Sequence, residues 1–294
     1  MICPTKILVY NVKFLPMLGR VFESPRFPGR YGFWEIGEKK RRDEERAALL
    51  AHQLTKARHY DLIVLAEVFA LHARRILKSE LQRAGFEIIT CPITNPLLVT
   101  SGLLIASRRP IIDQNFIAFR HASGSDRFAK KGMLRVSLEG EREKLHVFAT
   151  HLQAGDHAHA IRRAQLQEAR AFVDYELGRS DKGRSAIMGD LNIIGERDGK
   201  ETREYRSLRR IFNEFLDLHR LLREGEPEPT WDPIENRPMI GPHYHERERL
   251  DYVLVRGDED EFSPERGTSI GVERFILDGL ALSDHYALSA TLPF

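Results

Sequence analysis

Cysteine is nearly absent from this 294-residue chain, which has only Cys3 and Cys91. That count excludes the multi-disulfide scaffold of small secreted domains and suits a reducing compartment. No apolar run approaches the roughly 20 residues of a membrane-spanning helix, and there is no internal repeat or low-complexity tract. Lys and Arg (45) nearly balance Asp and Glu (43), for a net charge of +2. This balance argues against a surface adapted as a whole to duplex DNA, although it would not reveal a local basic patch.

A secretory signal is also missing from the sequence. The apolar stretch Ile7–Tyr10 is too short for the hydrophobic region of a signal peptide and runs directly into polar residues. We therefore expect the protein as given to be cytoplasmic, with peripheral membrane contact or secretion by another route as alternatives. The sequence does not predict the oligomeric state.

The sequence does contain an alternation of short apolar runs and helical patterns. Hydrophobic residues make up 42% and charged residues 30% of the chain, as in ordinary globular proteins. Buried strands are predicted at 6–10, 61–66, 145–150, 185–189 and 250–255, and helices after the N-cap Asp43 and over 158–177. Residues 16–42, which end in the basic run Lys39–Arg42, and residues 225–249 are predicted to be long loops. This order predicts one α/β domain over residues 1–294.

Residues able to bind a metal, a phosphate or a proton stand at the ends of the predicted strands. They are Asn11, Glu67, His151, Asp190 with Asn192, Asp251, and Asp284 with His285. Each alone is more typical of a turn or a salt bridge, but sheets gather their sites at strand ends, so the set predicts a shared site. Asp190 and Asn192 are two apart and point the same way, which suits handling a phosphate beside a divalent cation.

In this order, these residues resemble the motifs of the endonuclease/exonuclease/phosphatase superfamily over essentially the whole chain. Within the superfamily the chain is most similar to the bacterial neutral sphingomyelinases, which are phospholipase C-type enzymes. The stretches that carry this similarity are Tyr10-Asn11-Val12, Leu65–Phe69, Thr150–Ala154 with Arg162, Gln165 and Glu168, and Thr230-Trp231-Asp232 with Asn236. The resemblance implies a four-layered α/β sandwich, in which two packed mixed β-sheets are flanked by helices as in deoxyribonuclease.

The resemblance also implies a Mg²⁺-dependent phosphodiesterase, with Mn²⁺ or Co²⁺ as alternative cations. Glu67 would be the principal metal ligand, assisted by Asn11 and Asp284. His285 would be the general base, oriented by Asp251. Asp190 would orient the attacking water, and Asn192 and His151 would donate hydrogen bonds to the phosphate. Lys131 would contribute a positive charge near the phosphate. The residues implied to contact the rest of the substrate are Trp231, Asp232 and Asn236. Trp231 could stack on a choline head group.

The leading hypothesis is cleavage of a phospholipid head group at a membrane surface, most plausibly conversion of sphingomyelin to ceramide and phosphocholine. The secreted relatives have an apolar hairpin late in the chain, whereas this chain has the acidic turn Gly257–Glu261 between Asp251 and Ser283. A nuclease is a less favoured alternative because of the near-neutral charge. A phosphatase of inositol phosphates or phosphoinositides would need a basic pocket around Lys39–Arg42. An inactive binding module conflicts with the intact motif set.

Two histidine pairs resemble metal ligands but are interpreted as surface residues. They are His157 with His159, and His243 with His245. Neither pair has a cysteine or another partner at zinc-site spacing.

Overall fold

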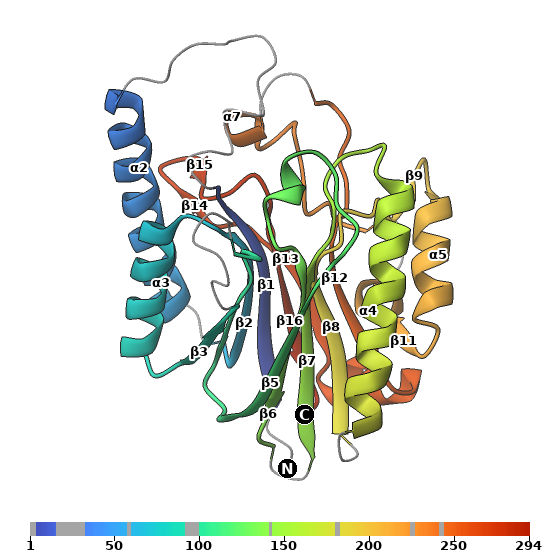
Figure 1. Cartoon of the computed structure of the whole chain (residues 1–294). Coiled ribbons are helices and arrows are strands. Elements are labelled where there is room, and N and C mark those ends of the chain that lie inside the picture. The colour runs from blue at the N-terminus through green and yellow to red at the C-terminus, as the bar shows by residue number, and fades with distance from the viewer. Residues whose placement is uncertain are drawn as a thin grey trace.

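Two mixed β-sheets lie face to face in the middle of the molecule, and helices cover their outer faces (Figure 1). The computed structural model describes residues 4–15, 33–57, 60–91, 100–140, 143–179, 183–223, 227–240 and 244–294. The first sheet has the strand order β13-β16-β1-β2-β4-β3. Its strands are β1 (Thr5–Phe14), β2 (Leu62–Val68), β3 (Glu87–Thr90), β4 (Leu104–Ser107), β13 (Ser269–Glu273) and β16 (Ala287–Leu292).

The second sheet has the strand order β11-β12-β8-β7-β6-β5. Its strands are β5 (Ile111–Ala118), β6 (Gly132–Leu138), β7 (Lys144–His151), β8 (Gly183–Asp190), β11 (Phe215–Asp217) and β12 (Asp251–Arg256). Each sheet has one parallel pair at its centre, β1 with β2 and β7 with β8. Two short hairpins lie outside the sheets, β9 (Glu196–Arg197) with β10 (Lys200–Glu201), and β14 (Ile276–Leu277) with β15 (Leu280–Ala281).

Helices form the outer layers on both sides (Figure 1). The first sheet is covered by α2 (Phe33–His52), which continues as a π-helical turn (Gln53–Ala57), and by α3 (Leu71–Arg83). The second sheet is covered by α4 (His159–Arg179) and α5 (Arg203–Ile211). Shorter pieces are α6 (Leu218–Leu222), α7 (Arg237–Ile240) and the 3-10 turns Gly124–Arg127, Glu259–Phe262 and Pro264–Arg266. Within the described part of the chain, no helix is long and apolar enough to cross a membrane.

Three hydrophobic cores separate the four layers. Alternation along β1 sends Val9 into the core between the sheets, and Leu8 into the core under α2 and α3. The third core lies between the second sheet and α4 and α5, where Phe148 of β7 packs with residues such as Leu166 and Tyr205. The predicted four-layered sandwich of two mixed sheets is therefore confirmed.

The prediction that a loop extends to residue 42 is wrong, because α2 begins at Phe33. Residues 16–32 of the predicted loop lie outside the described residues. The basic run lies inside the helix, and Asp43 is an interior residue rather than its N-cap. Glu, Lys and Arg favour helix, and opposite charges one turn apart support it. These pairs are Lys39 with Asp43, Lys40 with Glu44, and Arg41 with Glu45.

The late segment 225–249 also differs from the predicted surface loop, because several of its polar residues are buried, including Thr230, Asp232 and Arg249. The acidic turn Gly257–Glu261 follows β12, at the end of that strand opposite Asp251. The β14–β15 hairpin ends two residues before Ser283.

Candidate active site

Three predicted site residues form one row across the second sheet. The strand register pairs His151 of β7 with Asp190 of β8, and Asp190 with Asp251 of β12. All three are buried, and the His151 Nε2 atom lies 3.5 Å from Asp190 Oδ2. Because paired residues on neighbouring strands share a face of the sheet, the row presents its side chains to one place.

His285 joins this row just before β16 begins. Its Nδ1 atom lies 2.8 Å from Asp251 Oδ2, and its Nε2 atom lies 3.8 Å from Asp190 Oδ2. Burial lowers the pKa of His285, but the carboxylates of Asp251 and Asp190 outweigh it and raise this pKa to about 10. The Thr230 hydroxyl oxygen accepts a hydrogen bond from the Asp251 backbone N–H at 3.2 Å, which fixes the start of β12. An aspartate therefore holds the imidazole with Nε2 directed toward a second aspartate.

The first sheet supplies Asn11 from β1 and Glu67 from β2. The Asn11 amide donates to Asp190 Oδ2 at 2.9 Å and so ties the two sheets together at the site. Glu67 has a left-handed backbone (φ 60°), and its Oε1 atom lies 3.8 Å from His151 Nε2. A positive φ in a non-glycine residue costs roughly 1–3 kcal/mol and is found where function fixes a side chain.

These carboxylates are suited to a divalent cation. Burial, followed by the charge of Asp284, raises the pKa of Glu67 to about 7. Burial also raises the pKa of Asp190 to about 6. Ligand atoms of Glu67, His151 and Asp190 lie within 4.8 Å of one another. Clustered buried carboxylates are costly in ionised form unless a positive charge compensates them, and carboxylate oxygen is the donor that Mg²⁺ prefers. The residues present therefore fit a hard divalent cation.

Lys131 is buried beside His151 rather than solvated after Lys130. Its ammonium lies 2.7 Å from Asp126 Oδ2 and donates to His151 Nε2 at 3.0 Å. Burial and then the charges of Lys131 and His285 hold the pKa of His151 well below its usual value. Among the described residues, His151 Nδ1 has no hydrogen-bond partner. Lys131 thus joins the Asp126 carboxylate and neutral His151 at one corner of the site.

Asp284 is held by Lys13, a residue that the sequence analysis missed. The Lys13 ammonium lies 2.7 Å from Asp284 Oδ2. Burial raises the pKa of Asp284, but Lys13 and His285 outweigh it and hold this pKa below its usual range. Ser283 donates its hydroxyl to the Asn11 carbonyl at 2.6 Å. The signal for Lys13 was its spacing, because a residue two places after Asn11 in a strand faces the same side.

Asn192 lies on the turn that follows β8. Its backbone N–H donates to Asp190 Oδ1 at 2.8 Å, and its side-chain amide donates to the Leu152 carbonyl at 3.3 Å. The turn is tight, since Asn192 has φ 50° and Gly189 has φ 139°. A Cβ at Gly189 would lie 1.9 Å from the Thr150 carbonyl oxygen, so only glycine lets β8 approach β7 this closely.

The predicted substrate-side residues mainly shape the late loop. Both Asp232 oxygens have partners, because Oδ1 accepts from two backbone N–H groups of the turn and Oδ2 pairs with Arg247 at 3.0 Å. Asn236 is buried and donates to the Ser283 carbonyl at 2.7 Å. Trp231 is half-buried and packs edge-on against Tyr244, with ring centroids 5.1 Å apart. These contacts place the loop beside the strand start that carries Asp284 and His285.

The structure brings all of the predicted catalytic and metal-binding residues into one set of contacts, together with the predicted substrate-binding Lys131. The set is Asn11, Glu67, Lys131, His151, Asp190, Asn192, Asp251, Asp284 and His285. Of the dismissed histidines, His159 is exposed and pairs with Glu204, and His243 lies outside the described residues. In the described ranges, the clusters of side chains able to hold a metal consist of site residues alone.

Sequence comparison identifies the scaffold. The Endonuclease/Exonuclease/phosphatase family matches residues 8–285. The chain belongs to this family. Sphingomyelinase C 2 of Leptospira interrogans is 27% identical over 282 residues, which cover 86% of this chain but only 41% of that protein. A phospholipase C of Staphylococcus aureus is 25% identical over 252 residues, which cover 78% of this chain and 70% of that protein.

Solved structures show the same fold. The crystal structure of SmcL superposes with a TM-score of 0.74 at 21% identity, covering 98% of this chain and 99% of that one. A mutant beta toxin from Staphylococcus aureus with bound magnesium ions superposes with a TM-score of 0.70 at 21% identity, over the same shares of the two chains. The predicted family and fold are therefore both confirmed. Because nucleases and phosphatases hydrolyse phosphate esters, membership of this family also supports the prediction that the chain is a phosphoester hydrolase.

Proposed function

We propose that the protein is a metal-dependent phosphodiesterase that hydrolyses a phospholipid head group, with sphingomyelin as the first candidate substrate and ceramide and phosphocholine as products. The observation that carries the proposal is the buried His285–Asp251 pair, which faces Asp190 within a cluster completed by Asn11 and Glu67. An oriented base beside clustered carboxylates is what water attack on a phosphodiester requires.

The chemistry follows from the contacts of His285. Asp251 accepts a hydrogen bond from Nδ1–H, so Nε2 is the atom that takes a proton from water, and Asp190 next to it holds that water in line with phosphorus. The water oxygen forms a bond to phosphorus while the phosphorus–oxygen bond to the lipid breaks. The departing oxygen takes up a proton from solvent, and His285 afterwards releases to solvent the proton that it took from the attacking water. Lys131 and Asn192 stabilise the negative charge that builds on the phosphate oxygens, and His151, whose Nε2 accepts from Lys131, positions that ammonium.

We propose Mg²⁺ as the cation, with Glu67 as its principal ligand and Asn11 and Asp284 beside it. When bound, the cation supplies positive charge that polarises the phosphate oxygens and opposes protonation of His285. Support comes from the oxygen-rich donor set and from the magnesium ions bound to the mutant beta toxin. Mn²⁺ and Co²⁺ are the alternatives, because they accept similar ligands.

Two observations favour a lipid over other phosphodiesters. The named relatives are a sphingomyelinase and a phospholipase C. In addition, the β14–β15 hairpin, which leads into Ser283, exposes Ile276 and Leu280 by 45% and 55%. Apolar side chains at the rim of a site suit peripheral contact with a membrane surface. Three of the four residues of the basic run Lys39–Arg42 form ion pairs along α2. These pairs do not favour a phosphoinositide-binding pocket at this place.

A substrate panel tests the proposal. Purified protein is incubated with Mg²⁺ or EDTA and vesicles of sphingomyelin or phosphatidylcholine, lyso-lipids, inositol phosphates or plasmid DNA, with His285→Ala as the inactive control. We expect Mg²⁺-dependent release of phosphocholine from sphingomyelin. Turnover of phosphatidylcholine or a lyso-lipid alone would reject sphingomyelin but keep the lipid assignment. Turnover of inositol phosphates or plasmid DNA alone would reject the lipid assignment. Activity that survives His285→Ala would reject the site itself.

A further inference from the structure

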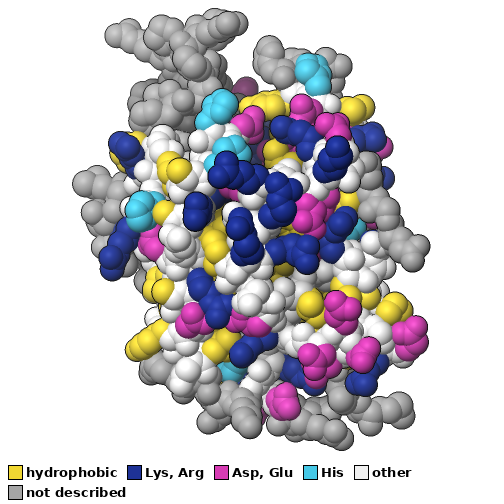
Figure 2. Space-filling model, turned by 90° about the vertical axis from the view of Figure 1, so that its right-hand side faces the viewer, with side chains coloured by type: hydrophobic (Ala, Val, Ile, Leu, Met, Phe, Trp, Pro, Cys, Tyr) yellow, Lys and Arg dark blue, Asp and Glu magenta, His cyan; other side chains and the backbone are white. Residues whose placement is uncertain are grey.

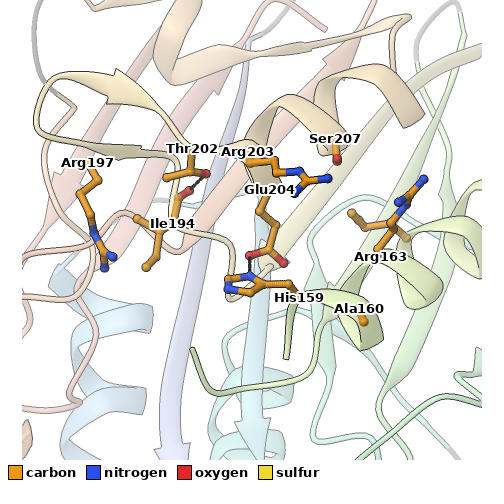
Figure 3. A pocket seen from close by; sticks show the side chains of 10 residues that line it. His159, Ala160, Arg163, Ile194, Arg197, Thr202, Arg203, Glu204 and Ser207 are labelled. Carbon is orange, nitrogen blue, oxygen red and sulfur yellow. Dashed lines mark hydrogen bonds and ion pairs between the residues drawn. The ribbon is translucent and has the colours of Figure 1, made fainter. Parts of the chain in front are cut away.

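A cavity of about 380 Å³ lies between the beginnings of α4 and α5, apart from the catalytic residues (Figure 3). The first turns of these helices form two of its walls, and the segment from Ile194 to Arg197 closes it. The proposed hydrolysis does not use this cavity. One of its lining residues, Ile194, lies only two positions after Asn192 in the chain.

The arginines of the cavity differ in whether a carboxylate pairs with them. Glu204 is neutralised by Arg162, which donates to its Oε1 at 2.7 Å and its Oε2 at 3.0 Å, and it also binds His159 at 2.7 Å. Arg197 pairs with Glu246 at 2.6 Å and with Glu248 at 3.5 Å. Arg163 and Arg203, in contrast, have no carboxylate within ion-pair distance among the described residues.

Arg163 and Arg203 are placed to act together. In Figure 3 both guanidinium groups lie toward the right-hand side of the cavity, and the Ser207 side chain lies next to that of Arg203. Their surroundings are positive as well, because α5 contains four arginines, at positions 203, 206, 209 and 210, and a single glutamate. Lys and Arg side chains gather across the face that carries α4 and α5 (Figure 2). An anion in the cavity would therefore meet no net repulsion.

We propose that this cavity binds a phosphate-type oxyanion through the Arg163 and Arg203 guanidinium groups and the Ser207 hydroxyl. Planar guanidinium groups bind phosphate oxygens in a forked, two-point geometry, and a hydroxyl supplies a further donor. A soluble phosphate and the phosphate of an anionic lipid head group present the same oxygens. The site is connected to the active site, because Arg162 also donates to the carbonyls of Gln153 and Gly155, in the loop that follows His151, at 2.9 and 2.7 Å.

Binding measured without turnover tests the site. In EDTA, inorganic phosphate is titrated calorimetrically into wild type, into Arg163→Gln/Arg203→Gln and into the matched control Arg75→Gln/Lys78→Gln, which removes two exposed charges from α3 on the opposite outer layer. Parallel flotation assays use vesicles of phosphatidylcholine alone or with phosphatidic acid. Because these side chains are exposed, all three proteins are expected to unfold at similar temperatures, and this is checked before titration.

We expect the cavity variant to bind phosphate at least about tenfold more weakly than wild type, and the control to stay within about twofold. If retention on phosphatidic acid vesicles falls in the cavity variant alone, the natural source is a lipid head group; if only phosphate binding falls, it is a soluble phosphate. Equal binding by wild type and the cavity variant in both assays, or no binding by wild type in either, overturns the proposal. Loss of hydrolysis on the substrate panel would leave these outcomes unchanged.

Discussion

Replacing Asp251 by asparagine tests how much the orientation of His285 contributes to catalysis, because the other site residues stay unchanged. The change keeps the size of the side chain but removes the charge that lies 2.8 Å from Nδ1, at a position with no solvent exposure. The amide can also present N–H to Nδ1, which would move the imidazole proton to Nε2 and abolish its capacity to accept a proton from water. Asp251→Asn should therefore impair the chemical step far more than substrate binding.

The expected loss in kcat is on the order of 10²–10⁴-fold, which is the usual share of an oriented general base. This corresponds to about 3–5 kcal/mol of transition-state stabilisation. We expect KM to change by less than about threefold, because Asp251 lies behind His285 and does not face the substrate. The assay measures kcat and KM with Mg²⁺ on the best lipid of the panel and on bis(p-nitrophenyl) phosphate.

Asp61→Asn is the matched control. Asp61 accepts the Lys6 backbone N–H at 2.8 Å just before β2, at the end of that strand away from Glu67, and asparagine can accept the same bond. This control should keep kcat within about twofold. If Asp251→Asn retains more than a tenth of wild-type kcat, or loses activity only through a raised KM, His285 is not an Asp-oriented base.

Three further predictions concern the backbone, a buried histidine and the metal. Gly189→Ala should lower the free energy of unfolding in urea by about 3–5 kcal/mol, because its Cβ would lie 1.9 Å from the Thr150 carbonyl; Gly178→Ala, with open space around its Cβ, should cost nothing. Burial lowers the pKa of His219 to about 4. Below about pH 6.5 the unfolded state therefore binds a proton that the folded state does not bind, and the free energy of unfolding decreases as the pH is lowered. His219→Leu should therefore reduce the loss of unfolding free energy between pH 7 and pH 5 by about 2 kcal/mol, and an unchanged loss would contradict that pKa. Glu67→Gln should raise the Mg²⁺ concentration that gives half of the thermal stabilisation by at least about tenfold; an unaltered Mg²⁺ titration would remove Glu67 as the ligand.

The strand ends could be predicted because apolar runs mark buried strands, and a polar residue after such a run is visible in the sequence. The register between strands was not predictable in the same way. That His151, Asp190 and Asp251 occupy one row depends on how β7, β8 and β12 slide along one another, and hydrogen bonds between distant segments decide this. The resemblance to a family supplied the grouping that local patterns could not.

The errors have local causes. The strand Ile111–Ala118 was missed because its exposed polar residues obscure the alternation expected at a sheet edge. The start of the helix at Phe33 was not predicted, because residues up to 42 were predicted to form a loop. Acidic residues do follow the basic run at helical spacing. The burial of Lys131 depends on Asp126 and His151, and no pattern near the lysine indicates such partners.

The site is divided between the sheets in a way that makes it depend on their packing. The second sheet contributes the row that ends in Asp190, and the first contributes Asn11 and Glu67. The Asn11–Asp190 hydrogen bond is formed only when the core between the sheets is closed, and the Ser283–Asn11 bond adds the start of β16 to the same point. The left-handed backbone of Glu67 is kept by this packing, since an isolated strand would relax to an extended conformation. The core between the sheets is thus what holds Asn11 and Glu67 of the first sheet beside Asp190 of the second.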